Sequence, residues 1–164
     1  MGEYDLRRPV VPSGTNLLGL VKHLAGVEYG YFVASFGRPL PERLPWVDDG
    51  SIEQDADLWA TAEQSSADIV ALYRRAAAHA DRTISELDLD APAVVAHWPP
   101  DRRDTTLAVL LVHMVVETSH HAGHADIARE LIDGRTGADL TLPAPAVFQA
   151  AQAAAEKIGR TVGR

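Results

Sequence analysis

The chain has 164 residues, of which 15 are Lys or Arg and 23 are Asp or Glu, so its formal net charge is −8 and one domain is expected. A hydrophobic share of 46% excludes a disordered or fibrous chain, and the acidic balance without any large basic cluster argues against nucleic-acid binding. The absence of cysteine excludes disulfides, iron–sulfur clusters and a cysteine nucleophile, so any metal would need His and carboxylate ligands.

The first expected helix follows a turn-rich N-terminal segment. Apolar residues recur at steps of three and four across residues 17–31, which is the period of an amphipathic helix. Ser13 or Thr15 is a suitable N-cap, and Pro39 cannot continue a helical hydrogen-bond ladder. We therefore expect the helix to end near Phe36.

A long loop and a second helix are expected next. Residues 38–51 are rich in Pro, Asp and Gly, which favours an ordered loop anchored by Trp46. Asp55 and Asp57 are N-cap candidates for a helix whose apolar spacing continues to about Leu87.

The most strongly patterned helix follows another loop. Residues 88–103 contain three prolines and are expected to be irregular, apart from a brief extended piece at Val94 and Val95. Thr105 or Thr106 can cap the helix, and Gly134 stands where a C-terminal glycine belongs. The expected span is roughly residues 106–133.

The remaining tail is alanine-rich, and residues 145–158 have apolar positions at helical steps. Alternating strand patterns are absent, so the sequence predicts an all-α helical bundle. Residues 1–134 are expected to form the bundle and residues 135–164 a tail helix that packs on the same or a partner bundle. Without a signal sequence or an apolar run of roughly 18 residues, we expect a cytoplasmic protein with no membrane partner.

A polar line runs along the strongest helix. His113, Glu117, His121 and His124 are separated by four, four and three residues, so they lie almost above one another beside an apolar stripe. A carboxylate and an imidazole directed at one divalent cation avoid the cost of burying either group alone. His23 of the first helix is the best candidate for a third ligand.

Simpler interpretations stay open for each of these residues. His23 could be a half-buried structural histidine, and Glu117 with His121 could form a hydrogen-bonded pair without a metal. His120 points about 100° away from His121 around the helix, so solvent or a hydrogen bond is its simpler role. His113 and His124 lie one turn from the expected ligands and could orient the ligands, contact a cosubstrate or serve as alternative ligands.

Two segments carry a resemblance to a known family. GTNLLGLVKHLAGVE at residues 14–28 and VHMVVETSHHAGHADI at residues 112–127 resemble the DinB/YfiT-like superfamily, in particular its actinobacterial branch. The likeness extends over residues 4–134. It implies a four-helix bundle that holds a divalent metal, zinc or nickel, and it places the ligands at His23, Glu117 and His121.

The resemblance also implies a chemistry. Mycothiol-dependent maleylpyruvate isomerases are similar to this chain in having Glu and then His four residues later, where many relatives have two histidines. Such proteins act as S-transferases with mycothiol, bacillithiol or glutathione. A metal lowers the pKa of a bound thiol, and three protein ligands leave a position open for it. The competing hypotheses are a non-catalytic binding bundle and a metal-dependent hydrolase.

The chain departs from these relatives at its N-terminus. They have a complete helix before the Arg-Pro-x-x-Pro-Ser-Gly-Thr segment, whereas Met1 stands only a few residues ahead of Arg8 and Pro9 here. We therefore expect a bundle that lacks the usual first helix. The tail could cover the open face, a second subunit could do so, or the sequence begins at a late start codon; a homodimer is the hypothesis we favour.

Overall fold

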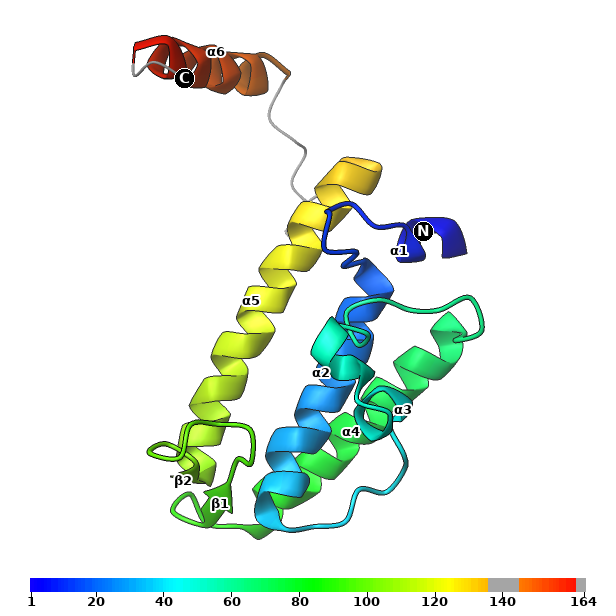
Figure 1. Cartoon of the computed structure of the whole chain (residues 1–164), viewed down its shortest axis with the longest axis vertical. Coiled ribbons are helices and arrows are strands. Elements are labelled where there is room, and N and C mark those ends of the chain that lie inside the picture. Colours follow the sequence, from blue (N-terminus) through cyan, green and yellow to red (C-terminus); the bar gives the residue numbers. More distant parts are fainter. Residues whose placement is uncertain (136–144, 162–164) are drawn as a thin grey trace.

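The computed structural model describes residues 1–135 and 145–161, and three long helices dominate it (Figure 1). The middle helix of the three is α2 (Leu17–Phe32), which packs against both α4 (Ser66–Glu86) and α5 (Leu107–Asp133). The predicted all-α class is confirmed, because the described residues contain only one short two-stranded sheet besides helices. The other elements are α1 (Glu3–Arg7), η1 (Ala34–Phe36), α3 (Pro45–Asp48), η2 (Ser51–Gln54), β1 (Pro92–Val94), β2 (Asp104–Thr106) and α6 (Pro145–Thr161).

The N-cap of helix α2 is Asn16, one position after Thr15 and three after Ser13. The side chain of Asn16 accepts a hydrogen bond from the Gly19 amide at 2.8 Å and donates to the Arg7 carbonyl at 2.8 Å. The predicted caps were wrong, because Ser13 and Thr15 hydrogen-bond to each other instead. The helix ends at Phe32, and a 3₁₀ turn carries the chain on to residue 36.

Helix α4 begins about ten residues later than predicted. Its N-cap is Ser65, whose hydroxyl accepts from the Asp68 amide at 3.0 Å, so the assignment of Asp55 or Asp57 as the cap was wrong. Asp55 has a left-handed backbone with φ of 58°. Asp57 is instead only 6% exposed, which places a carboxylate inside the fold.

The segment that holds Asp57 is fastened to α2. The buried ammonium group of Lys22 donates to the carbonyls of Ala56 and Trp59 at 2.6 and 3.1 Å and to the Gln64 side chain at 3.2 Å. Gly19 allows the segment to come this close, since a Cβ there would lie 1.9 Å from the Leu58 carbonyl oxygen. These contacts fix the position of Asp57 relative to α2.

Helix α5 has the expected limits. Thr106 occupies the N-cap position, although its side chain makes no capping hydrogen bond, and Gly134 follows the last residue with φ of 73°, a left-handed conformation that favours glycine. The brief extended piece expected near Val94 is part of the antiparallel β1–β2 hairpin, in which Pro92 pairs with Thr106. As expected, Trp46 is an anchor of the loop after α2: it is 5% exposed, and the Lys22 ammonium lies 4.6 Å from its ring centre.

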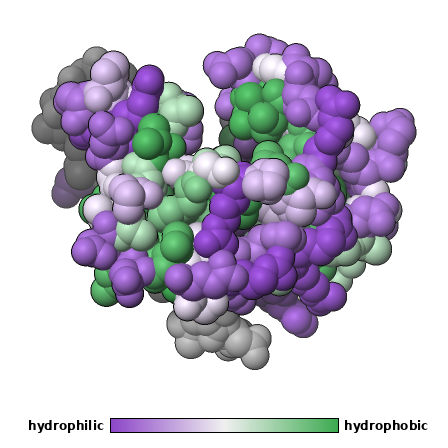
Figure 2. Space-filling model, turned by 90° about the horizontal axis from the view of Figure 1, so that it is seen from below, coloured by the Kyte–Doolittle hydropathy of each residue, from purple (hydrophilic) through white to green (hydrophobic). Residues whose placement is uncertain are grey.

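Apolar side chains remain on the surface. Val112 and Val115 of α5 are 67% and 68% exposed, and Figure 2 shows apolar areas among hydrophilic ones on the face seen from below. Helix α6 stands apart from the three long helices in Figure 1, and its side chains at residues 148–157 are exposed. Residues 136–144 and 162–164 of the expected tail, and the side chains of Val147 and Ile158, lie outside the described residues.

The N-terminal helix α1 spans five residues. Within the described residues, no helix combines the length and the apolar character that crossing a membrane requires.

Candidate metal centre

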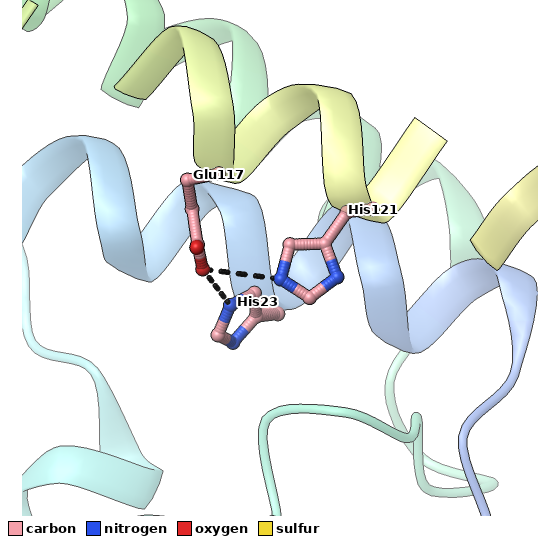
Figure 3. A group of neighbouring side chains, drawn as sticks. All are labelled: His23, Glu117 and His121. Carbon is pink, nitrogen blue, oxygen red and sulfur yellow. Dashed lines mark hydrogen bonds and ion pairs between the residues drawn. The ribbon is translucent and has the colours of Figure 1, made fainter. Parts of the chain in front are cut away.

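One carboxylate oxygen of α5 lies close to an imidazole nitrogen of α2. Oε1 of Glu117 on α5 lies 3.3 Å from Nε2 of His23 on α2 and 3.1 Å from Nε2 of His121, one turn further along α5 (Figure 3). The candidate ligand atoms of the three residues all lie within 4.8 Å of one another. We call these three residues the His-Glu-His group.

The spacing of these atoms fits a divalent metal. Two ligand atoms bound to tetrahedral zinc at roughly 2.0 to 2.1 Å are about 3.3 Å apart. The Glu117 oxygen has this separation from both histidine nitrogens. Imidazole nitrogen and carboxylate oxygen are both common zinc ligands, and three of them leave a fourth position open. These three residues could therefore hold a metal ion and leave a position open for a further ligand.

Asp57 supports His23 from behind. Its Oδ2 lies 2.6 Å from Nδ1 of His23, so Nδ1 donates its hydrogen to the carboxylate and Nε2 is left facing Glu117. A carboxylate behind a histidine in this way fixes the tautomer and ring orientation that a metal requires. Asp57 is the residue of the site that sequence reasoning missed. Its spacing before a helical pattern suggested an N-cap instead.

His124 stands in the corresponding place behind His121. The Nδ1 atoms of the two rings lie 3.4 Å apart, and the ring centres are 5.4 Å apart. Because a carboxylate only accepts hydrogen bonds, Nε2 of His121 carries the hydrogen that it shares with Glu117, and its Nδ1 accepts from His124. A metal bound to Nε2 would reverse the second contact, with Nδ1 of His121 donating to His124. Asp57 and His124 thus lie behind the two histidines of the His-Glu-His group.

Burial and hydrogen bonds shift the pKa values of all three residues of the His-Glu-His group. Burial raises the pKa of Glu117, but its hydrogen bonds to His23 and His121 outweigh this effect and lower it overall. Burial also lowers the pKa of His23, yet the hydrogen bonds to Asp57 and Glu117 raise it above its usual value. Burial and the nearby His23 lower the pKa of His121. Glu117 is therefore ionised.

A pocket of about 430 Å³ opens beside the group, and we call it the acidic pocket. Three carboxylates line it together with an imidazole and a phenol that contact each other. His97 Nε2 lies 3.3 Å from the Tyr31 hydroxyl, which also accepts a hydrogen bond from the Trp98 indole at 3.2 Å. The polar side chains that line this pocket are His23, Tyr31, Glu53, Asp57, His97 and Glu117.

The other histidines differ in their surroundings. The His113 ring lies 4.7 Å from that of Tyr31 and 5.1 Å from that of Trp98, at a smaller hollow that Arg102 also lines. His120 is exposed, as expected for its direction on α5. The place of His97 beside Tyr31 depends on a contact between segments 66 positions apart, so its spacing in the sequence gives no sign of it.

Comparison with protein families agrees with this geometry. The family model described as mycothiol S-transferase matches residues 1–134. The chain belongs to this family. The mycothiol S-transferase family is part of the DinB-like superfamily, so the predicted resemblance is confirmed. Comparison with curated proteins gives no match, and neither does comparison with solved structures. The match covers all three residues of the His-Glu-His group and stops at the glycine that follows α5.

Proposed function

We propose that this member of the mycothiol S-transferase family is a metal-dependent S-transferase that uses a low-molecular-weight thiol, with mycothiol as the first choice. The proposal is carried by the convergence of two imidazole nitrogens on one ionised carboxylate beside a pocket. His23, Glu117 and His121 would hold the metal, for which zinc is the first choice and nickel the second. A divalent metal at this site would lower the pKa of a coordinated thiol and so supply a thiolate at neutral pH.

The protein's own side chains have separate roles in this proposal. With a metal bound at both Nε2 atoms, Asp57 and His124 would accept the Nδ1 hydrogens of His23 and His121 and so orient the two imidazoles. The acidic pocket offers several acceptors and the Tyr31–His97 pair, which suit the hydroxyl groups of a sugar-containing thiol. The His113 ring packs against Tyr31, and through this contact it would help to bind the cosubstrate.

The location and the assembly follow as parts of the same proposal. Reduced low-molecular-weight thiols are maintained in the cytoplasm, so we place the reaction there. We propose that residues 1–134 form the metal-binding bundle and that the chain is a homodimer. The exposed valines of α5 offer an uncovered apolar face for association.

One assay separates this function from its alternatives. The purified protein is loaded with zinc or nickel, its metal content is measured by elemental analysis, and it is mixed with mycothiol and monochlorobimane. Formation of the fluorescent thioether should require metal, protein and thiol together, and chelation should abolish it. Ester or amide cleavage without thiol would indicate a hydrolase, and metal binding with neither activity would indicate a non-catalytic bundle. Either result would overturn the proposal.

A further inference from the structure

A second pocket lies on the other side of the His-Glu-His group. It has a volume of about 310 Å³, and His124 is one of its lining residues. No residue that lines it in the described part of the chain is charged, whereas three carboxylates line the acidic pocket. We call it the apolar pocket. Its apolar lining residues are Val10, Val11, Leu20, Ile127, Ala128 and Leu131.

The two pockets and the His-Glu-His group follow one another along the interface of α2 and α5. Leu20 and Ile127 line the apolar pocket at one end. Tyr31 lines the acidic pocket and contacts His113 at the other end. Helices α2 and α5 therefore run antiparallel along this interface. In both helices, the His-Glu-His group lies between the residues at the apolar pocket and those at the acidic pocket. A metal held there would have one pocket on each side.

The walls of the apolar pocket leave apolar surface uncovered. Ile127 and Leu131 are each 60% exposed, and Val11 is 41% exposed. The polar groups at its edge already have partners: the Asn16 amide bonds to the backbone, and Ser13 bonds to Thr15. An apolar molecule of suitable size would bury this surface without displacing any of these bonds.

His124 connects this pocket with the His-Glu-His group. Its Nδ1 faces Nδ1 of His121 at 3.4 Å, and its ring also lines the apolar pocket. A ligand in the apolar pocket would therefore contact the imidazole of His124, which adjoins His121 of the His-Glu-His group.

We propose that the apolar pocket binds the second substrate, an electrophile with an uncharged apolar body, while the thiol occupies the acidic pocket. This inference rests on the proposed function, and it names the substrate class and the place where that substrate binds. The thiol and the electrophile would approach the His-Glu-His group from opposite sides. Their reacting atoms would then meet between the two pockets.

The reaction with an alkyl chloride is a nucleophilic substitution at carbon. The thiol loses its proton to solvent, and the electron pair of the sulfur forms a bond to the carbon that carries chlorine. The carbon–chlorine bond breaks, and chloride leaves with its electron pair. No oxidant or reductant is needed, and an uncharged product with a carbon–sulfur bond is released from the apolar side.

The test places a charge at the edge of the apolar pocket. Ile127→Asp changes an already exposed side chain, so the fold should survive, and Leu89→Asp is the matched control because Leu89 is 62% exposed and lines none of these pockets. Binding is measured by the fluorescence of dimethylbimane, which has no leaving group and cannot react. Ile127→Asp should weaken this binding about tenfold or more, whereas Leu89→Asp should leave it unchanged.

Kinetics with monochlorobimane and mycothiol form the second arm. Ile127→Asp should raise KM for monochlorobimane and leave KM for mycothiol and the bound metal content unchanged. If dimethylbimane does not bind to the unchanged protein, or binds Ile127→Asp and the unchanged protein equally, the inference is wrong even where thiol transfer occurs. If dimethylbimane binds as expected but no thioether forms, the apolar site stands and the proposed function fails.

Discussion

Oδ2 of Asp57 lies 2.6 Å from Nδ1 of His23, although the two residues belong to different segments and are separated by 34 positions. We expect Asp57→Ala to weaken zinc binding by about 10- to 100-fold, because His23 loses the acceptor that fixes its tautomer. Asp57→Asn keeps an acceptor oxygen and should retain part of the affinity. Competition with a fluorescent zinc chelator measures these changes.

Two controls accompany the Asp57 variants. Asp90→Ala removes an exposed carboxylate from the loop after α4 and should not change zinc affinity. Thermal unfolding of the metal-free proteins distinguishes a positioning role from a loss of folding, since Asp57 is nearly buried. Equal zinc affinities for Asp57→Ala and Asp90→Ala would show that Asp57 does not position His23.

Neighbouring histidines on α5 should behave differently. His121→Ala removes a nitrogen that lies 3.1 Å from the Glu117 carboxylate, and it should abolish tight metal binding and thiol transfer. His120 is exposed and points about 100° away around the helix, so His120→Ala should alter neither. Elemental analysis and the thioether assay measure both properties, and equal losses in the two variants would contradict the assignment.

The close approach of residue 58 to α2 can be tested with two glycines of the same helix. A Cβ at Gly19 would lie 1.9 Å from a backbone oxygen, so Gly19→Ala should lower the free energy of unfolding by about 1 to 3 kcal/mol or more. A Cβ at Gly30 meets nothing within 4 Å, and Gly30→Ala should stabilise the helix by about 0.5 to 1 kcal/mol. Chemical denaturation checks the contrast, and similar values for both would contradict this packing.

The exposed valine face of α5 leads to a prediction about assembly. Val112 and Val115 lie one turn apart and are each about two-thirds exposed, which favours burial against a second copy. Light scattering at micromolar concentration should give a particle of twice the 17.7 kDa chain mass, and Val115→Lys should shift it toward the single chain. A particle near 17.7 kDa for the unchanged protein would refute the homodimer.

Local patterns in the sequence predicted much of the fold. The apolar spacing and Gly134 delimited α5 correctly, and Thr106 stands at the predicted N-cap position without a side-chain capping bond. The alignment of Glu117 with His121 also follows from helical geometry alone. Whether His23 faced them needed the packing of α2 on α5, for which the family resemblance provided the expectation.

Long-range contacts decided the features that sequence reasoning misassigned. Several residues near a helix start can serve as the cap, and the choice at Asn16 depends on its second bond, to the Arg7 carbonyl. Asp57 looked like a cap because acidic residues are common there, but the Lys22 bonds hold its segment against α2 instead. The first of these contacts spans nine positions and the Lys22 bonds span 34 and 37, so none of them lies within one helical turn.

The sequence by itself determined the helical class, the family and the identity of the three residues that meet at the candidate metal centre. Helical periodicity and side-chain chemistry are properties of neighbouring residues, so they can be inferred from a linear chain. Only the tertiary structure placed Asp57 behind His23, joined Tyr31 to His97 and put an apolar pocket beside His124. These relationships exist because α2, α5 and the loops between them pack together, and packing is a property of the whole chain.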